Sequence, residues 1–254
     1  LVVVVSMFCL VFASPAWADI VMDGEFADWD EQAHITDPQG DTIIDYWDIA
    51  DFAWANNADD DNLYFKFERY DGALSPTVDT TVFFDINDNG GYRDRGDCFA
   101  VVHYRPLNNN SKVDVEVFRY GRNSIPQFVS FYHGKWGESY REGALRWEFY
   151  VPMDDLGIQM GQSIRMYAVT MDLAGFMYDF DEGENGNDKD KYHDNNGHEY
   201  EHHDFDIIDR VPDQGDIQWS PIPILGQWGW LYLLFGGLVA AVFILWKRGK
   251  LWAG

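Results

Sequence analysis

Short runs in which apolar and polar side chains alternate are the feature that most constrains the fold of this chain. Residues 113–117, VDVEV, alternate without a break, and residues 63–68, 145–149 and 164–168 follow the same period of two. This period is typical of strands that bury one face. Further strands are expected at residues 49–55, 78–86, 98–104 and 127–132, between turns rich in Asp, Asn and Gly.

Many short strands separated by turn signals predict an all-β fold, which we expect to be a two-sheet antiparallel β-sandwich of the Ig-like or jelly-roll type. Helical periodicity is nearly absent, and one short helix is expected at residues 152–156. Aromatic residues make up 17% of the chain, which is ample material for such a core. The sandwich is expected to span residues 19–216, with an acidic, His-rich insert at 179–206.

The first eighteen residues, LVVVVSMFCLVFASPAWA, are apolar and end in the small-residue pattern Ala16-Trp17-Ala18. This pattern predicts a secretory signal peptide at residues 1–18, with cleavage before Asp19. A buried strand or an uncleaved anchor is the alternative interpretation. A signal peptide would place the body of the protein outside the cytoplasm.

A second apolar stretch lies at the other end. Residues 228–246 carry no charge and are about as long as a helix needs to be to cross a bilayer. Trp228 and Trp246 lie at its two ends, and Lys247 and Arg248 follow it. The pattern predicts a linker at 217–227, a transmembrane helix at 228–246 and a basic cytoplasmic tail at 247–254. We therefore expect an exported protein, anchored in the membrane with its ectodomain outside.

The chain is strongly acidic, with a formal net charge of −25. Such a charge repels nucleic acid and attracts cations, so no nucleic-acid partner is expected. Beyond the predicted signal peptide the only cysteine is Cys98, which excludes an internal disulfide. Cys98 lies in a strand pattern, so we expect it to be a small core residue. The body must then be held together by its core or by metal.

Residues 85–97, DINDNGGYRDRGD, follow an apolar run and resemble the first half of a calcium loop. Oxygen-bearing side chains on alternate residues, followed by Gly90, allow short arms to converge on one ion. The loop lacks the closing Glu of an EF-hand, so Asp94 or Asp97 would have to close the site. The expected calcium ligands are Asp85, Asn87, Asn89, Asp94 and Asp97. The alternative is a polar hairpin rich in turn-forming residues.

The insert at residues 179–206 suggests two further metal sites. Asp179, Asp181 and Glu182 could hold a second calcium ion. His198, His202 and His203 could capture a transition metal such as zinc, copper or nickel, because imidazole suits these ions. The alternative is a solvated acidic loop, which its composition favours.

Sequence motifs for catalysis are missing. The chain contains no Gly-x-Ser-x-Gly motif, P-loop or dinucleotide fingerprint, and we expect no enzymatic activity.

Trp54 and Trp147 lie in strand patterns and are expected in the core. Trp47 and Trp136 lie near loops, where flat rings could stack on sugars. Histidine and methionine residues show no spacing that would hold a haem, so haem is not expected.

A series of short motifs recurs in a recognisable order: DGEFADW, DIADFAWA, DNLYF, VFFD, then WEFYVP with DLG and GQSI. Together they cover most of residues 19–172. This region resembles the carbohydrate-binding family 9-like domains, which are relatives of the DOMON fold. The resemblance implies a β-sandwich that binds sugars, binds haem, or serves as a calcium-stabilised accessory module.

The stretch IPILGQWG at residues 222–229 resembles the start of IPTL-type C-terminal sorting signals. That resemblance implies recognition by an exosortase-like membrane enzyme. Ile224 and Gln227 depart from the usual Thr and Glu, so simple anchoring is the preferred interpretation.

The sequence therefore predicts a non-catalytic, surface-anchored, calcium-stabilised module whose ligand is a carbohydrate or another cell-surface polymer. Two alternatives stay open at this point. One is a haem-binding electron-transfer module of the DOMON type, and the other is a structural or adhesion protein without a small ligand.

Overall fold

A computed structural model describes residues 19–42, 47–57, 59–71, 77–171, 191–193, 199–201 and 207–221. The predicted signal peptide and the predicted span at 228–246 lie outside these residues. Within the described part of the chain, no helix is long and apolar enough to cross a membrane.

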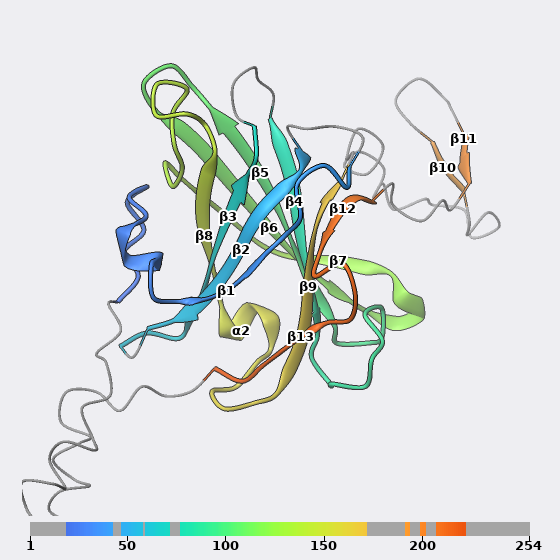
Figure 1. Cartoon of the computed structure of the whole chain (residues 1–254). Helices are drawn as coiled ribbons and strands as arrows, with labels where there is room; N and C mark the ends of the chain where they lie inside the picture. The colour runs from blue at the N-terminus through green and yellow to red at the C-terminus, as the bar shows by residue number, and fades with distance from the viewer. Residues whose placement is uncertain are drawn as a thin grey trace, which may run out of the picture.

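Two antiparallel sheets form the body (Figure 1). The first sheet has the order β1-β2-β3-β8, and the second has the order β12-β9-β4-β5-β6-β7, with β13 also paired to β9. The strands of the first sheet are β1 (Ala33–Thr36), β2 (Ile49–Asn56), β3 (Asn62–Arg69) and β8 (Arg146–Pro152). Those of the second are β4 (Val78–Asp85), β5 (Cys98–Pro106), β6 (Ser111–Tyr120), β7 (Pro126–Gly134), β9 (Ile164–Met171), β12 (Ile207–Val211) and β13 (Ile217–Trp219).

The remaining elements are short. β10 (Lys191–His193) and β11 (Glu199–Glu201) pair with each other. Two 3-10 turns, η1 (Ala27–Trp29) and η3 (Arg122–Ser124), and one helix, α2 (Met153–Leu156), complete the described elements. The predicted helix at residues 152–156 is confirmed, with Pro152 as its N-cap and Gly157 in the left-handed conformation as its C-cap.

The apolar faces of the two sheets pack against each other. Phe65 of β3 lies 5.7 Å from Phe84 of β4 between ring centroids, and Trp147 of β8 stacks on Tyr104 of β5 at 4.7 Å. All four side chains are fully buried. Stacked rings of this size bury large apolar areas and fix the spacing of the sheets. The predicted all-β, sandwich-like architecture is therefore confirmed.

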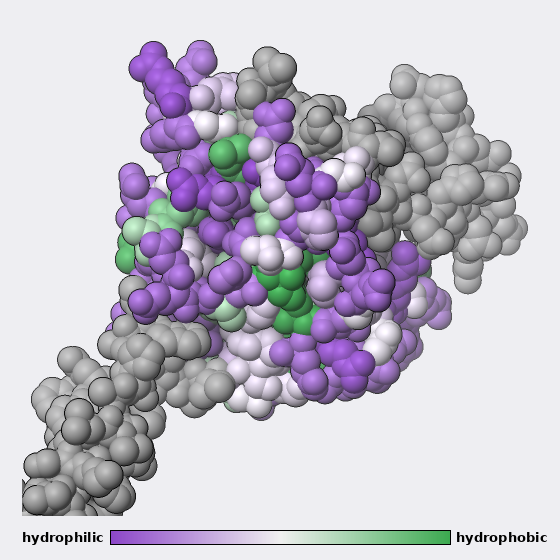
Figure 2. Space-filling view, in the orientation of Figure 1, coloured by the Kyte–Doolittle hydropathy of each residue, from purple (hydrophilic) through white to green (hydrophobic). Residues whose placement is uncertain are grey.

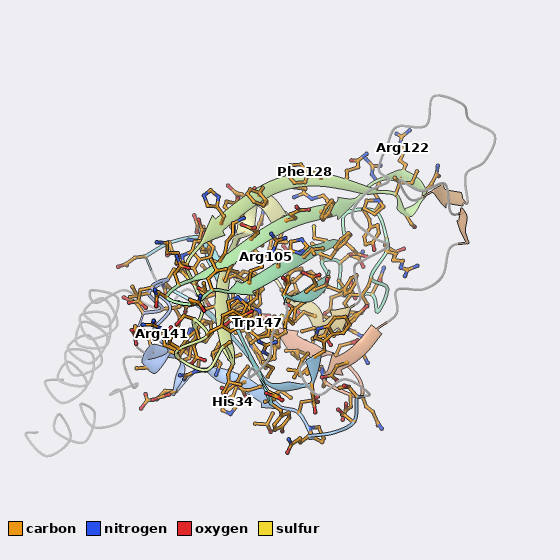
Figure 3. The ribbon with its side chains drawn as sticks, turned by 90° about the horizontal axis from the view of Figure 1, so that it is seen from above. His34, Arg105, Arg122, Phe128, Arg141 and Trp147 are labelled. Carbon is orange, nitrogen blue, oxygen red and sulfur yellow. The ribbon has the colours of Figure 1, made fainter. Side chains whose placement is uncertain are left out.

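Most expected strands appear where the alternation placed them. Trp147 is fully buried, as predicted, whereas Trp54 is only half-buried and packs against the edge of the core. Cys98 is buried, which agrees with its predicted role, and burial raises the pKa of its thiol to about 11. Figure 3 shows Trp147 within the body and Phe128 on β7, the last strand of the second sheet, where Phe128 is exposed.

The outer face of the second sheet carries an apolar cluster of its own, which the alternation did not predict. Phe83, Phe99, Phe118 and Val169 are buried there. Tyr167 stacks on Phe83 at 5.0 Å between centroids, and Tyr92, from the loop after β4, meets Tyr167 edge-on at 4.6 Å. This sheet is thus apolar on both faces over part of its width.

A buried carboxylate ties the N-terminal segment to the first sheet. Glu148 of β8 accepts hydrogen bonds from the backbone N–H of Asp23 at 3.1 Å and of Gly24 at 2.8 Å, and from Trp29 Nε1 at 2.8 Å. Gly24 has φ +83°, and an added Cβ would lie 3.1 Å from the Lys135 carbonyl oxygen, so the turn requires glycine. The motifs DGEFADW and WEFYVP therefore meet in space.

Candidate metal centre

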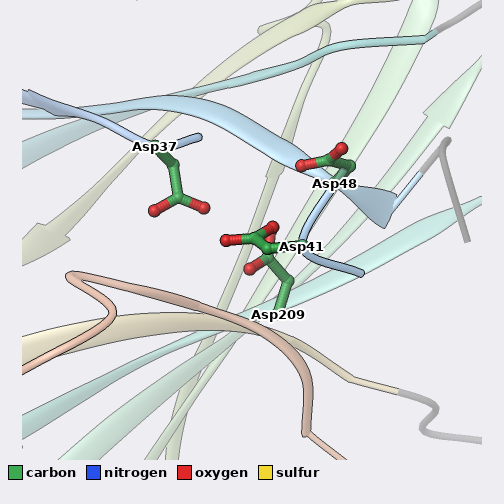
Figure 4. A group of neighbouring side chains, drawn as sticks. All are labelled: Asp37, Asp41, Asp48 and Asp209. Carbon is green, nitrogen blue, oxygen red and sulfur yellow. The ribbon is translucent and has the colours of Figure 1, made fainter. Parts of the chain in front are cut away.

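Four aspartates gather where the loop between β1 and β2 meets β12 (Figure 4). Asp37 directly follows β1, Asp41 lies in the loop, Asp48 directly precedes β2, and Asp209 lies in β12. One carboxylate oxygen from each lies within 4.8 Å of the others. Because β2 and β12 belong to different sheets, the group spans both layers of the sandwich.

Backbone groups hold three of these residues in position. Asp48 Oδ2 accepts the N–H of Gly40 at 2.7 Å. Asp209 Oδ2 accepts the N–H of Ile49 at 2.6 Å, which joins β12 to the start of β2. The N–H of Asp37 donates to the Ala50 carbonyl at 3.1 Å. Gly40 has φ +85°, a conformation that glycine adopts readily, and it lets the loop turn back toward Asp48.

Burial and mutual repulsion make this group electrostatically unfavourable. Asp37, Asp48 and Asp209 are buried, while Asp41 is exposed. Burial, followed by the charge of Asp209, raises the pKa of Asp37 to about 8. Burial also raises the pKa of Asp209 to about 6, against hydrogen bonds from the Ile49 and Arg210 N–H groups that lower it. Negative charge at this point needs a compensating cation.

One carboxylate atom points to a ligand in its own right. Asp37 is only 4% exposed, and its Oδ2 has no hydrogen-bond partner among the described residues. Its carboxylate points toward Asp41 and Asp209 (Figure 4). A buried, unpaired carboxylate oxygen costs free energy that a bound cation would recover.

The donor set suits a hard divalent cation. All four ligands are carboxylate oxygens, which calcium and magnesium prefer over softer metals. Calcium accepts a flexible set of six to eight oxygens, and the exposed Asp41 leaves room for water to complete the shell. The arrangement can therefore hold calcium and join the β1–β2 loop to β12.

Sequence reasoning missed this group. Asp37, Gly40 and Asp41 occur in DPQGD, and Asp48 in WDI, so each resembles an ordinary turn residue or strand flank. Asp209 lies far along the chain, and no local spacing connects it to the others. The repeated pairing of Asp with the start or end of strands was the only available signal.

The structure places the predicted calcium loop, residues 85–97, at the last residue of β4 and in the connection from β4 to β5. Asp85 accepts the N–H groups of Asn89 at 3.2 Å and Gly90 at 2.6 Å. Asp97 accepts the N–H groups of Ile86 at 3.1 Å and Asp94 at 2.8 Å. Both aspartates are fully buried.

Side-chain contacts complete this network. Asn87 Nδ2 donates to Asp97 at 3.4 Å, and Asn89 Nδ2 donates to Asp94 Oδ2 at 2.8 Å. Burial raises the pKa of Asp97. These bonds are those expected of a polar hairpin, and Asp85, Asp94 and Asp97 do not form a group of three close ligand atoms within the described part of the chain. Calcium in this loop stays a prediction.

Both rings that were predicted to stack on sugars are partly buried, and their binding of sugar stays a prediction. Trp47 is half-buried and packs against the core, and its carbonyl accepts Thr170 Oγ1 at 2.9 Å. Trp136 is half-buried against Tyr150, with ring centroids 5.3 Å apart. The metal candidates of the insert, Asp179, Asp181, Glu182, His198, His202 and His203, lie outside the described residues.

Comparisons with known proteins give no family assignment. No family model, curated protein or solved structure matches this chain. The resemblance to carbohydrate-binding family 9-like domains is therefore an expectation from the motifs alone.

Proposed function

We propose that this protein is an exported, membrane-anchored and non-catalytic β-sandwich that calcium stabilises, and that it binds carbohydrate or another cell-surface polymer. The cluster of Asp37, Asp41, Asp48 and Asp209 carries the calcium part of this proposal, because it combines four oxygen ligands with a buried, unpaired carboxylate atom. The motif order supports a carbohydrate-binding family 9-like sandwich of the Ig-like or jelly-roll type.

Calcium in this position would have a structural effect. Asp37 and Asp48 frame the β1–β2 loop, whereas Asp209 belongs to the opposite sheet. An ion bound by all of them links the two layers at one end of the sandwich. Trp47 immediately precedes Asp48, so the same ion fixes the backbone that carries one of the proposed sugar-stacking rings. Metal binding and ligand binding are thus coupled in this proposal.

Calcium stoichiometry tests the metal part. With the full chain in detergent, equilibrium dialysis is expected to give a saturable calcium site that Asp37→Asn and Asp209→Asn each weaken by at least about tenfold. Asp59→Asn, which removes an exposed acid outside the cluster, is the matched control. Asp85→Asn tests the predicted loop site separately. Loss of binding in Asp85→Asn with retention in Asp37→Asn would move the ion to residues 85–97.

Glycan binding tests the rest of the proposal. A polysaccharide and glycan screen is run with calcium and again with EDTA, on the wild type, Trp47→Ala and Trp136→Ala. We expect a calcium-dependent ligand whose affinity falls in Trp47→Ala, since the ring supplies stacking area worth roughly 1 kcal/mol or more. If no glycan binds while the calcium site is intact, the protein is a structural or adhesion component. A Soret band after addition of haem would instead support the electron-transfer alternative.

A further inference from the structure

A row of alternating acids and histidines crosses four strands of the second sheet. Asp79 of β4 pairs with His103 of β5, His103 pairs with Asp114 of β6, and Asp114 pairs with His133 of β7. Directly opposed residues of neighbouring antiparallel strands have Cβ atoms about 5 Å apart and share a face. The four side chains therefore lie side by side.

This row lies on the outer face of the sheet. Val102 and Tyr104, which flank His103 along β5, both belong to the core between the sheets. Val113 and Val115, which flank Asp114, do so as well. Since successive side chains of a strand point to opposite faces, His103 and Asp114 point away from that core. The row is therefore independent of the four-aspartate cluster, which lies between the β1–β2 loop and β12.

His103 is held in a way typical of a metal ligand. Its Nδ1 lies 2.6 Å from Asp79 Oδ1, and an ionised carboxylate can only accept, so the Nδ1 N–H donates. The neutral imidazole then has its lone pair on Nε2. His103 is only 7% exposed, and its Nε2 has no hydrogen-bond partner among the described residues. A carboxylate behind one ring nitrogen commonly orients the other toward a metal.

Asp114, which is directly paired with His103, presents a second possible ligand atom that has no hydrogen-bond partner among the described residues. The residue is 6% exposed, and its Oδ1 is buried without a partner within the described ranges. Its Oδ2 accepts a hydrogen bond from Lys112 Nζ at 2.6 Å. His103 Nε2 and Asp114 Oδ1 therefore belong to directly paired residues, and both are buried acceptors without a partner among the described residues. Such atoms are unfavourable unless something binds to them.

Glu116 adds a third acidic group on the same face. It lies two residues beyond Asp114 on β6, and it is half-buried. Burial raises the pKa of Glu116, while His103 lowers it and Asp114 raises it, so all three groups interact. Asp79, Asp114 and Glu116 supply three carboxylates. The Lys112 ammonium and the Arg105 guanidinium, which belong to directly paired residues on the same face, supply two positive charges. The remaining negative charge suits a divalent cation.

We propose that this face binds a divalent transition-metal ion of the zinc type through His103 Nε2 and Asp114 Oδ1, with Glu116 and His133 completing the donor set. Asp79 is a positioning residue, since it orients the His103 ring. Within the described residues, only the four aspartates already bring three ligand atoms within 4.8 Å. Binding therefore requires the half-buried Glu116 and the exposed His133 to rotate inward.

The two sites select different ions. Imidazole with carboxylate suits zinc, copper and nickel, whereas the four aspartates offer oxygen alone and suit calcium. Zinc binding should therefore persist in excess calcium. The experiment uses the full chain with His193→Gln, His198→Gln, His202→Gln and His203→Gln, which removes the imidazoles of the insert. Equilibrium dialysis with zinc, in millimolar calcium, then measures the remaining binding.

In this background we expect one zinc ion per chain and a visible absorption band after cobalt substitution. His103→Gln and Asp114→Asn should each weaken zinc binding by at least about tenfold. Asp79→Asn should keep the cobalt band and weaken binding by roughly 10- to 100-fold. His34→Gln is the control, because His34 lies exposed in β1 of the other sheet (Figure 3).

Near-ultraviolet circular dichroism checks that each variant is folded, and Asp114→Asn decides the test if His103→Gln does not fold. No zinc binding in the background protein would overturn the proposal. Zinc binding of equal strength in Asp114→Asn would also overturn it, because the ion would then be held by other surface groups.

Discussion

In EDTA, the full chain is expected to lose stability as the pH rises from about 4 to about 8, and saturating calcium is expected to restore it. Burial and neighbouring acids raise the pKa of Asp37 to about 8 and that of Asp209 to about 6, above their ordinary value of 3.8. A raised folded-state pKa means that the folded protein binds protons more tightly than the unfolded chain. This contribution to stability is complete below the ordinary value and is lost as the pH passes through about 6 and then about 8.

Calcium requires the ionised carboxylates, so its stabilising effect should grow over the same interval. At about one hundred times the dissociation constant, the ion adds about 2.7 kcal/mol to the free energy of unfolding. For a body of this size, that corresponds to a rise in Tm of roughly 5–10 °C. Thermal unfolding at about pH 5 and about pH 8, with EDTA and with calcium, measures both effects.

Asp37→Asn separates the cluster from other titrating groups. The neutral amide removes the repulsion, so this variant should be more stable than the wild type in EDTA at about pH 8 and should respond weakly to calcium. Asp59→Asn should behave like the wild type. An Asp37→Asn protein that keeps the full calcium response would show that the stabilising ion binds elsewhere. Other buried acids such as Glu148 also make the free energy of unfolding depend on pH. Their contribution is the same in each of these variants, so it cancels when the variants are compared.

Replacement of Glu148 by alanine is expected to lower the free energy of unfolding by about 3–5 kcal/mol. The carboxylate is fully buried and accepts three hydrogen bonds, from Asp23, Gly24 and Trp29. The change leaves three buried donors without an acceptor and opens a cavity beside Trp29. Urea denaturation measures the loss, and protection of the Trp29 indole N–H from hydrogen exchange should fall with it.

Glu148→Gln is the matched variant. Its amide oxygen can still accept from the backbone of Asp23 and Gly24, but its NH₂ faces the Trp29 donor, so a smaller loss of about 1–2 kcal/mol is expected. Burial raises the pKa of Glu148 to about 7, so its contribution to stability declines as the pH rises through about 7. The glutamine variant should lack this part of the pH dependence. Equal losses in Glu148→Ala and in Glu68→Ala, a control in β3 whose side chain is only partly buried, would contradict the proposed anchoring role.

Local patterns predicted the strands well because the period of two is a property of each segment. The run VDVEV became part of β6, and LRWEF contributed to β8. The apolar cluster on the outer face was missed because a run such as VFF in β4 carries no alternation to show which side is covered. Trp54 was misplaced for a related reason, since a strand pattern shows the facing of a side chain but not its depth.

The candidate sites show that a local sequence pattern does not reveal groups of residues that lie far apart in the chain. Residues 85–97 were noticed because their ligand-type residues are adjacent in sequence. The aspartates at 37, 41, 48 and 209 were missed because they come together only through the pairing of β1 with β2 and the packing of β12 against β2 across the two sheets. The row from Asp79 to His133 likewise depends on the registers of three strand pairs. A single sequence does not specify such registers, because alternation fixes the face of a side chain and not its partner.

The exit and return of the chain at β9 and β12 have a consequence for engineering. Met171 and Ile207 are directly paired across these neighbouring strands, so the intervening segment leaves and rejoins the sheet at one place. Closing a loop between adjacent points costs free energy that grows only with the logarithm of its length. The segment between Met171 and Ile207 could therefore be lengthened, shortened or replaced by another segment while the sandwich kept its strand order.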